Sequence, residues 1–202
     1  MMNRPGSLRL TLDRFRRSED GNVAIEAMII LPLVFWAYLG MFSIFDTYRQ
    51  HTNNQKATYT ISDMISRQVS PLDASFVDGA RSLFDELTRT ITESNLRISV
   101  VQYDTASGSY QVVWSQVRGN TFNSLTSSDV SSWHDRLPVM PDDDQIIVVE
   151  TRTVHEPVFD LGLATRNIDN FVFTRPRYAK QLCYSTTCAI VTPTVVTPTD
   201  ID

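Results

Sequence analysis

The carboxylate of Glu26 stands at the edge of the longest uncharged stretch of the chain. Glu26 is the fifth residue after Gly21, and no charged residue occurs from Ala27 to Phe45. An ionised carboxylate in lipid is costly unless a cation neutralises it or the side chain reaches the headgroups. The spacing therefore leaves two alternatives for Glu26, which are pairing with a positive group or solvation at one face of a bilayer.

The uncharged stretch predicts one transmembrane helix. About 19 residues at 1.5 Å each span roughly 28 Å, close to the hydrocarbon thickness of a bilayer. The Leu, Ile, Val and Phe side chains of this stretch outweigh the penalty of Glu26, which lies near one end. Pro32 removes an intrahelical hydrogen bond, so we expect a kink at that position.

Basic residues are concentrated before this stretch. The segment before Gly21 contains five arginines, whereas only Arg49 and Lys56 follow Phe45 closely. The positive-inside rule therefore predicts a single-pass protein of the inner membrane, with a cytoplasmic N-terminus and a periplasmic C-terminal part. A cleaved secretory signal is the first competitor, but its apolar core would be only about 7 to 15 residues and would end in a small-x-small site.

The junction between leader and helix carries a more specific pattern. Phe15-Arg16-Arg17, the run from Gly21 to Glu26, and Leu31-Pro32-Leu33 resemble the prepilin-like junction of the TadE-like family, the pseudopilins of tight-adherence (Flp-type, type IVb) pili. The resemblance implies that Gly21 precedes the bond cut by a prepilin peptidase and that Asn22 becomes the new N-terminus. It also implies that Glu26 pairs with a free N-terminal amine. An uncleaved signal anchor, with Glu26 at the cytoplasmic headgroups, is the alternative.

The composition leaves room for one membrane helix and one outer domain. The chain has 202 residues, of which 42% are hydrophobic, and an outer part of about 150 residues is long enough for a core. The formal net charge is −5, and the leader is basic, so the outer part is acidic. Nucleic acid is therefore not an expected partner, because phosphate binding requires a basic face.

Two cysteines, Cys183 and Cys188, lie close together near the C-terminus. In an oxidising periplasm this spacing predicts a small disulfide loop. A zinc site would need further ligands, and no histidine lies in this tail. No metal and no cofactor is therefore expected.

The other titratable residues form no catalytic motif. The histidines are scattered at His51, His134 and His155, and His134-Asp135 is not accompanied by a glycine-flanked nucleophile. Asp142-Asp143-Asp144 lacks the alternating oxygen spacing and the glycine of a calcium loop, so a solvated acidic turn is expected there. The chain is therefore not expected to be an enzyme.

Hydrophobic periodicity predicts an α+β fold, in which a long N-terminal helix is followed by a second helix and a small antiparallel sheet. An amphipathic stripe over 47–70 continues the first helix and covers either the core of the domain itself or a neighbouring subunit. Ser70 and Pro71 suit the start of a second helix over 71–92. Strands are expected over 96–103, 110–117, 145–155 and 171–174, with a polar excursion containing one helical turn over 119–144.

The expected organisation has five parts: a cytoplasmic leader at 1–21, a transmembrane helix at 22–46, an amphipathic extension at 47–70, a periplasmic α+β domain at 71–182, and a Cys-loop with a Thr/Pro-rich tail at 183–202. The resemblance implies a non-enzymatic minor pseudopilin that assists the assembly of a tight-adherence pilus. Its implied partners are the prepilin peptidase, other pilin-like subunits and membrane lipid. The alternative is an uncleaved, membrane-anchored periplasmic scaffold or binding subunit.

Overall fold

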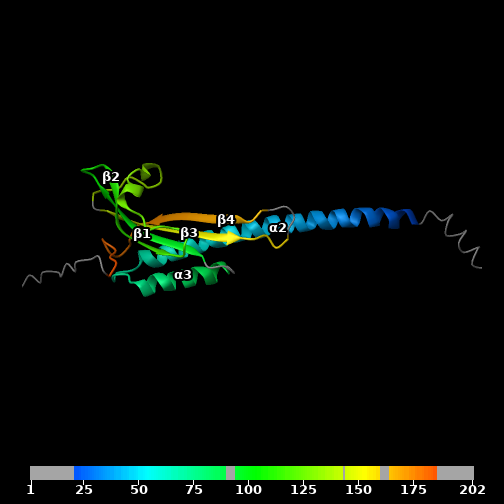
Figure 1. The fold of residues 1–202 in the computed structure, drawn as a ribbon, viewed down its shortest axis with the longest axis horizontal. Helices are drawn as coiled ribbons and strands as arrows, with labels where there is room; N and C mark the ends of the chain where they lie inside the picture. The colour runs from blue at the N-terminus through cyan, green and yellow to red at the C-terminus, as the bar shows by residue number, and fades with distance from the viewer. Residues whose placement is uncertain (1–20, 90–93, 143, 160–163, 186–202) are drawn as a thin grey trace, which may run out of the picture. The chain divides into compact units, whose positions relative to one another are not determined.

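A four-stranded antiparallel sheet and several helices confirm the α+β class (Figure 1). The computed structural model describes residues 21–89, 94–142, 144–159 and 164–185. The expected leader, apart from Gly21, and the Thr/Pro-rich tail lie outside these described residues. The first helix, α2, spans Gly21–Ser66 and is uninterrupted through Pro32.

Two compact units make up the chain. The helical unit comprises Met1–Asp46 with Pro157–Leu163, and the sheet unit comprises Thr47–Glu156 with Ala164–Asp202. Helix α2 contributes its first part to the helical unit and its last part to the sheet unit. The two parts are described separately below.

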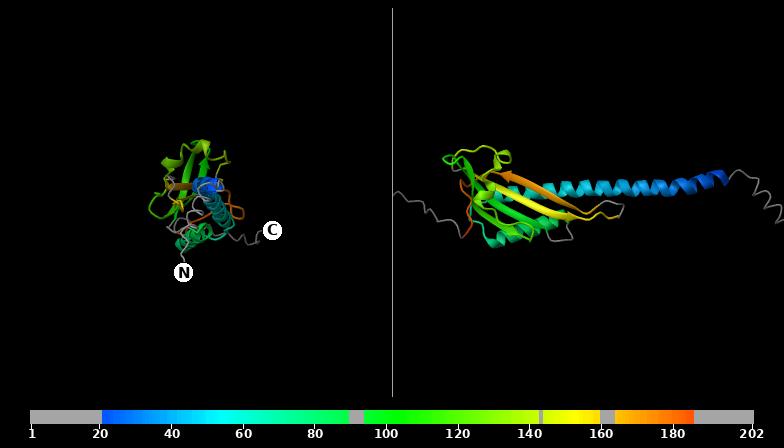
Figure 2. Two further views of the ribbon diagram at one scale, coloured as in Figure 1. Left: turned by 90° about the vertical axis from the view of Figure 1, so that its right-hand side faces the viewer. Right: turned by 45° about the horizontal axis from the view of Figure 1, so that its top comes forward.

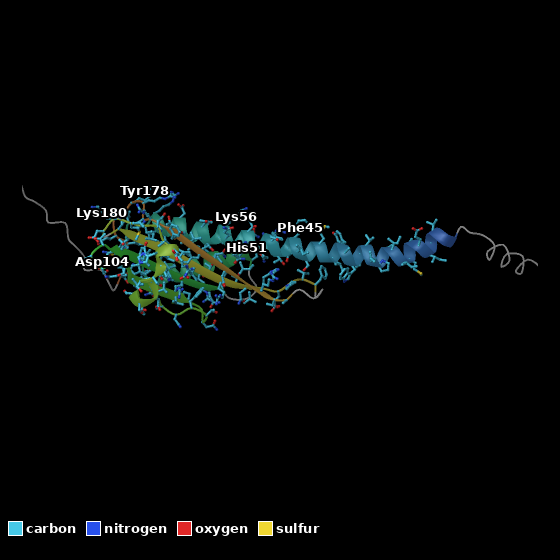
Figure 3. The ribbon with its side chains drawn as sticks, turned by 90° about the horizontal axis from the view of Figure 1, so that it is seen from above. Phe45, His51, Lys56, Asp104, Tyr178 and Lys180 are labelled. Carbon is cyan, nitrogen blue, oxygen red and sulfur yellow. The ribbon has the colours of Figure 1, made fainter. Side chains whose placement is uncertain are left out.

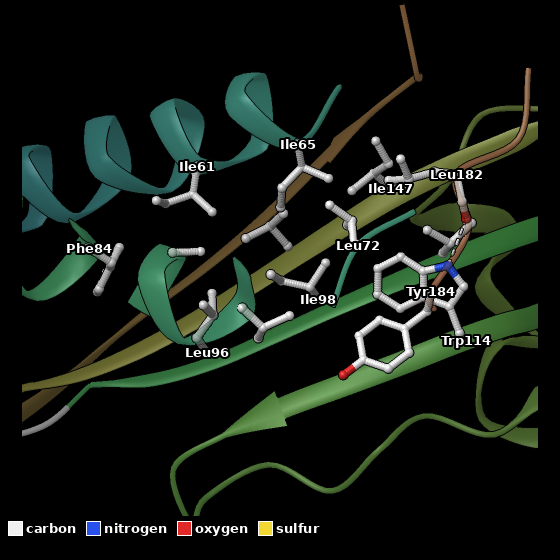
Figure 4. Close-up of a cluster of buried hydrophobic side chains, with 14 of the residues drawn as sticks. Ile61, Ile65, Leu72, Phe84, Leu96, Ile98, Trp114, Ile147, Leu182 and Tyr184 are labelled. Atoms are coloured by element: carbon white, nitrogen blue, oxygen red, sulfur yellow. Dashed lines mark hydrogen bonds between the residues drawn. The ribbon is translucent and has the colours of Figure 1, made fainter. Parts of the chain in front are cut away.

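The last part of α2 turns one face into the core of the sheet unit. Ala57, Ile61 and Ile65 are buried there, and Met64 packs beside them. Figure 4 shows Ile61 and Ile65 pointing from the helix into this cluster. The predicted amphipathic stripe is confirmed, and it covers the core of the domain itself.

The second helix, α3, spans Ala74–Thr88 and begins later than predicted. Its N-cap is Asp73, whose Oδ1 accepts a hydrogen bond from the Phe76 amide at 2.8 Å. The predicted start at Ser70 and Pro71 is wrong, because Leu72 forms a parallel β-bridge with Tyr184 and is not helical. A helix can begin only after this bridge, and Asp73 is the next residue able to cap it.

The sheet has the strand order β2-β1-β3-β4, and all neighbouring strands are antiparallel. The bounds are Asn95–Asp104 for β1, Ser109–Arg118 for β2, Gln145–His155 for β3 and Arg166–Thr174 for β4. The predicted hairpin between β1 and β2 is confirmed, and its turn contains Gly108 with φ 62°. β4 starts earlier than predicted, because its polar first half pairs with the end of β3.

A β-bulge in β2 changes which of its side chains face the helices: Val112 and Trp114, two positions apart, lie on opposite faces of the sheet. The register shifts between Val100 and Val101, where Val113 is the extra residue of β2. Trp114 consequently joins Val100 in the cluster on the helix side. Val112 packs with Val101 in a second cluster on the opposite side.

The helix-side cluster joins α2, α3 and three strands (Figure 4). The segment after β4 closes one end of it. The Trp114 ring lies 5.6 Å from the Tyr184 ring, between centroids, and its Nε1 donates to the Leu182 carbonyl at 2.8 Å. This pairing satisfies the one polar atom of a buried indole.

The opposite face is covered by the segment between β2 and β3. This segment contains α4, Ser127–Val130, and the 3-10 turn η1, Trp133–Asp135, which confirms the expected helical turn. Buried side chains from it pack against the sheet: Val130, Trp133, Leu137 and Met140. Figure 2 shows this segment on the side of the sheet away from α3. Both faces of the sheet are therefore covered.

Candidate functional site

The predicted processing site lies in the first turn of α2. Gly21 and Asn22 both have helical backbone, and the exposed side chain of Glu26 follows about one turn later. The next basic residue towards the C-terminus is Arg49, roughly 35 Å further along the helix. A cation that neutralises Glu26 must therefore come from the N-terminal side or from another molecule.

The first part of α2, in the helical unit, exposes its apolar side chains (Figure 3). Exposed residues include Ile29, Leu33, Trp36 and Phe45. Of the described helices, α2 is long and apolar enough to cross a membrane. Removing these side chains from water requires an apolar environment that the described residues do not provide, and a bilayer is one such environment.

Within the helical unit, the loop between β3 and β4 contacts this apolar helix. The ring of Phe159 packs edge-on against Phe42, with 5.9 Å between centroids and 65° between ring planes. The neighbouring Val158 is exposed. The loop therefore adds apolar surface beside an already apolar segment of α2.

No family model, curated protein or solved structure matches the chain. Its function is therefore inferred from its own residues and contacts. In the helical unit the contact described above joins two aromatic rings, and in the sheet unit several contacts are buried and polar.

Buried polar side chains fasten α2 to β3 in the sheet unit. Asn54 Oδ1 accepts a hydrogen bond from Thr153 Oγ1 at 2.8 Å, and Asn54 Nδ2 donates to the Gln50 carbonyl at 2.9 Å. One turn later, the hydroxyl oxygens of Thr58 and Thr151 lie 2.9 Å apart. Because a buried polar group without a partner is costly, these bonds hold the helix at one position along the strand.

An arginine and aromatic cluster covers the opposite side of β3. Arg97 Nε and Nη2 both lie 2.6 Å from Glu150 Oε2, and the guanidinium stacks 4.8 Å from the centre of the Phe122 ring. Arg152 stacks on the same ring and donates to Asp169 Oδ2 at 3.0 Å. The hydrogen bond to Asp169 raises the pKa of the Arg152 guanidinium.

A pocket of about 420 Å³ opens beside this cluster, and its lining includes Arg97, Phe122 and Asp129. Arg97 Nη1 donates to the Asn123 carbonyl at 2.8 Å. Asp129 accepts from the hydroxyl and the amide of Thr126, and the hydroxyl lowers the pKa of this carboxyl. The charged groups of the lining are thus bonded within the sheet unit, which indicates a structural role for the cluster.

The three histidines are not brought together. The His134 ring lies 5.3 Å from the Tyr110 ring, His155 Nε2 lies 3.4 Å from Thr47 Oγ1, and His51 is exposed. In the described ranges, no group of three or more His, Cys, Asp or Glu side chains is placed to hold a metal ion.

The acidic turn at 142–144 makes polar contacts within the sheet unit. Asp142 Oδ1 accepts from the Thr105 amide at 2.9 Å, and Asp144 Oδ2 lies 3.5 Å from Arg175 Nη1. Asp143 lies outside the described residues.

The predicted disulfide between Cys183 and Cys188 falls only partly within the described residues. The carbonyl of Cys183 accepts from the Leu72 amide at 2.8 Å. Cys188 lies outside the described residues, so the pairing stays a prediction.

Three sets of contacts were not anticipated from the sequence. They are the Asn54–Thr153 hydrogen bond, the Arg97–Glu150 ion pair and the Phe42–Phe159 ring contact. A local signal exists for the ion pair, because Arg97 lies between the apolar residues Leu96 and Ile98, and Glu150 directly follows the apolar run Ile146 to Val149. No local signal identifies the ring contact, which joins residues far apart in the chain.

Proposed function

We propose that the protein is a membrane-anchored, non-enzymatic minor pseudopilin that assists the assembly of a tight-adherence pilus. The supporting observation is the exposed apolar part of α2, which begins at Gly21 and carries one carboxylate before Phe45, that of Glu26. A helix of this kind can lie in a bilayer and pack beside similar helices. The arginines before Gly21 favour a cytoplasmic N-terminus, which would leave the sheet unit in the periplasm.

In this proposal, Glu26 fixes the position of one subunit against the next. Cleavage between Gly21 and Asn22 creates a positively charged amine at the new N-terminus. An unpaired carboxylate in lipid is costly, so Glu26 and the amine of a neighbouring subunit attract each other at a defined height. Because both residues of the bond lie in a helical turn, the peptidase must first unwind it. Glycine eases this step, since it is about 1 kcal/mol less favourable in a helix than alanine.

The cleavage step is tested by the intact mass and N-terminal sequence of the membrane-extracted protein, with and without the prepilin peptidase. A mature chain that starts at Asn22 only when the peptidase is present supports the proposal. A chain that keeps the leader in both strains favours the alternative, an uncleaved membrane-anchored scaffold or binding subunit.

The pairing step is tested by Glu26→Gln. We expect near-normal cleavage and a clear loss of surface pili, because the amide cannot neutralise the amine. Glu86→Gln is the matched control, since Glu86 is an exposed glutamate on α3, and it should leave pilus output unchanged. Normal pilus output from Glu26→Gln would rule out the pairing role.

A further inference from the structure

We propose that the described start of the loop between β3 and β4, Pro157 to Phe159, is a second membrane contact, which places Val158 and Phe159 in lipid beside α2. The partner is a lipid surface, and the inference rests on the proposed membrane anchoring by α2. It adds to that function a contact from Phe159, which lies 117 residues after Phe42 in the chain (159 − 42).

The ring contact in the helical unit sets the depth of this loop. Phe159 packs on Phe42, at 5.9 Å between ring centroids. Phe42 lies four positions before Asp46, the first charged residue after the uncharged stretch. At 1.5 Å per residue, Phe42 is roughly 6 Å inside that boundary. Apolar groups of interfacial segments lie about 5 to 10 Å into the boundary between headgroups and acyl chains.

Charge and exposure agree with this depth. In the chain, Glu156 and Asp160 flank the run from Pro157 to Phe159, and Asp46 immediately follows the uncharged stretch of α2. Val158 is 63% exposed, and Phe42 remains 45% exposed despite the ring contact. The loop and the helix therefore present apolar side chains at the same membrane depth. Charged residues follow in the sequence where each segment leaves that depth.

Lipid accounts for this surface better than a second copy of the chain does. Exposed apolar side chains occur at many positions on the first part of α2, and the loop continues that surface. A bilayer covers all of these positions at once, whereas one neighbouring helix covers only a single face.

The proposal is tested with nitroxide labels on the full chain in phosphatidylethanolamine and phosphatidylglycerol vesicles. Labels are attached to cysteines introduced by Val158→Cys, Leu33→Cys and Val139→Cys, and the chain without an introduced cysteine provides the labelling background. Val139 is the matched control, because it is an exposed valine of the sheet unit, 84% exposed. Collisions with oxygen, which partitions into lipid, are compared with collisions with a water-soluble nickel chelate.

We expect the ratio of oxygen to nickel collisions at position 158 to be several-fold higher than at position 139, and closer to that at position 33. A ratio at 158 equal to that at 139, with position 33 in lipid, overturns the loop contact and leaves the anchor intact. A water-like ratio at position 33 overturns the anchor, and the loop contact with it. Dipolar broadening at position 158 that disappears on dilution with unlabelled chain would show a second copy at this surface and would also overturn the proposal.

Discussion

The two parts of α2 differ in how their apolar side chains are covered. In the sheet unit, one face of the helix is covered by the strands and by α3. In the helical unit, apolar side chains are exposed at nearly every position before the Phe42 contact. The first part is therefore stable in water only with help from outside the described chain, while the second part is held by its own domain.

The difference is visible in the residue types. The covered part carries buried polar side chains along its inner face, and two of them, Asn54 and Thr58, hydrogen-bond to β3. The exposed part carries no charge from Ala27 to Phe45. Polar groups can specify one position on a sheet, because each needs its own partner. A uniformly apolar surface requires an apolar environment, but it does not fix the helix at one position within it.

The largest expected effect compares two isoleucines of the same helix. Ile61 is 0% exposed and Ile29 is 70% exposed. Ile61→Ala should lower the free energy of unfolding of the sheet unit by about 2 to 5 kcal/mol, because it leaves a cavity in the core. Ile29→Ala should change it by less than about 0.5 kcal/mol. Denaturant unfolding of the full chain in detergent micelles measures the free energy of unfolding of both variants. Equal losses of stability would contradict the difference between the two parts of α2.

The contrast is sharpened by the buried hydrogen bond between Asn54 and Thr153. Asn54→Ala should lower the free energy of unfolding by about 1 to 3 kcal/mol, because it leaves a buried hydroxyl without its acceptor. Thr153→Val removes the other partner, and the double variant should lose less than the sum of the two single variants. Gln55→Ala, at the exposed neighbouring position, is the control. Strictly additive losses would show that the two side chains are not coupled.

The smallest effect concerns how the two helices begin. α2 has no acidic residue in its first turn, whereas α3 is capped by Asp73. The hydrogen bond from the Phe76 amide holds the pKa of the Asp73 carboxyl below its ordinary value of 3.8. The ionised cap therefore stabilises the fold fully above this ordinary value, and the contribution is lost as the pH falls through the lower pKa of the folded state.

Asp73→Asn keeps a capping acceptor but removes this titration. We expect the thermal midpoint of the variant to fall less steeply than that of the natural chain below about pH 4, with a similar midpoint near neutral pH. Glu86→Gln serves as the control for loss of an exposed carboxylate. Parallel pH profiles for the natural chain and Asp73→Asn would refute the role of the ionised cap.

Local patterns in the sequence predicted most of the elements. The bounds of β3 were predicted correctly, since four consecutive β-branched residues, Ile146 to Val149, leave little ambiguity. The first half of β4 was missed because Arg166 to Asn170 is mostly polar, and its strand conformation depends on pairing with β3. The start of α3 was placed too early for a similar reason, since the bridge of Leu72 to Tyr184 is a long-range contact.

The candidate functional site also has features that local sequence predicts and contacts that it does not predict. Glu26 and the uncharged stretch can be recognised from residue type alone, and the structure contains the expected long helix. The contact of Phe159 with Phe42 could not be predicted, because neither residue differs in type or pattern from an ordinary core phenylalanine. Contacts between distant segments depend on the fold as a whole, about which local periodicity carries no information.

The bridge between Leu72 and Tyr184 also determines when the domain can be completed during synthesis. The Leu72 amide donates to Cys183, the Ser185 amide donates to the Leu72 carbonyl, and the Trp114 indole donates to Leu182. All three acceptor or donor groups from the C-terminal segment emerge from the ribosome long after the residues that they join. A chain truncated before Leu182 would leave a buried indole nitrogen and both backbone groups of Leu72 without partners. The domain can therefore close only after the chain has been synthesised through Ser185.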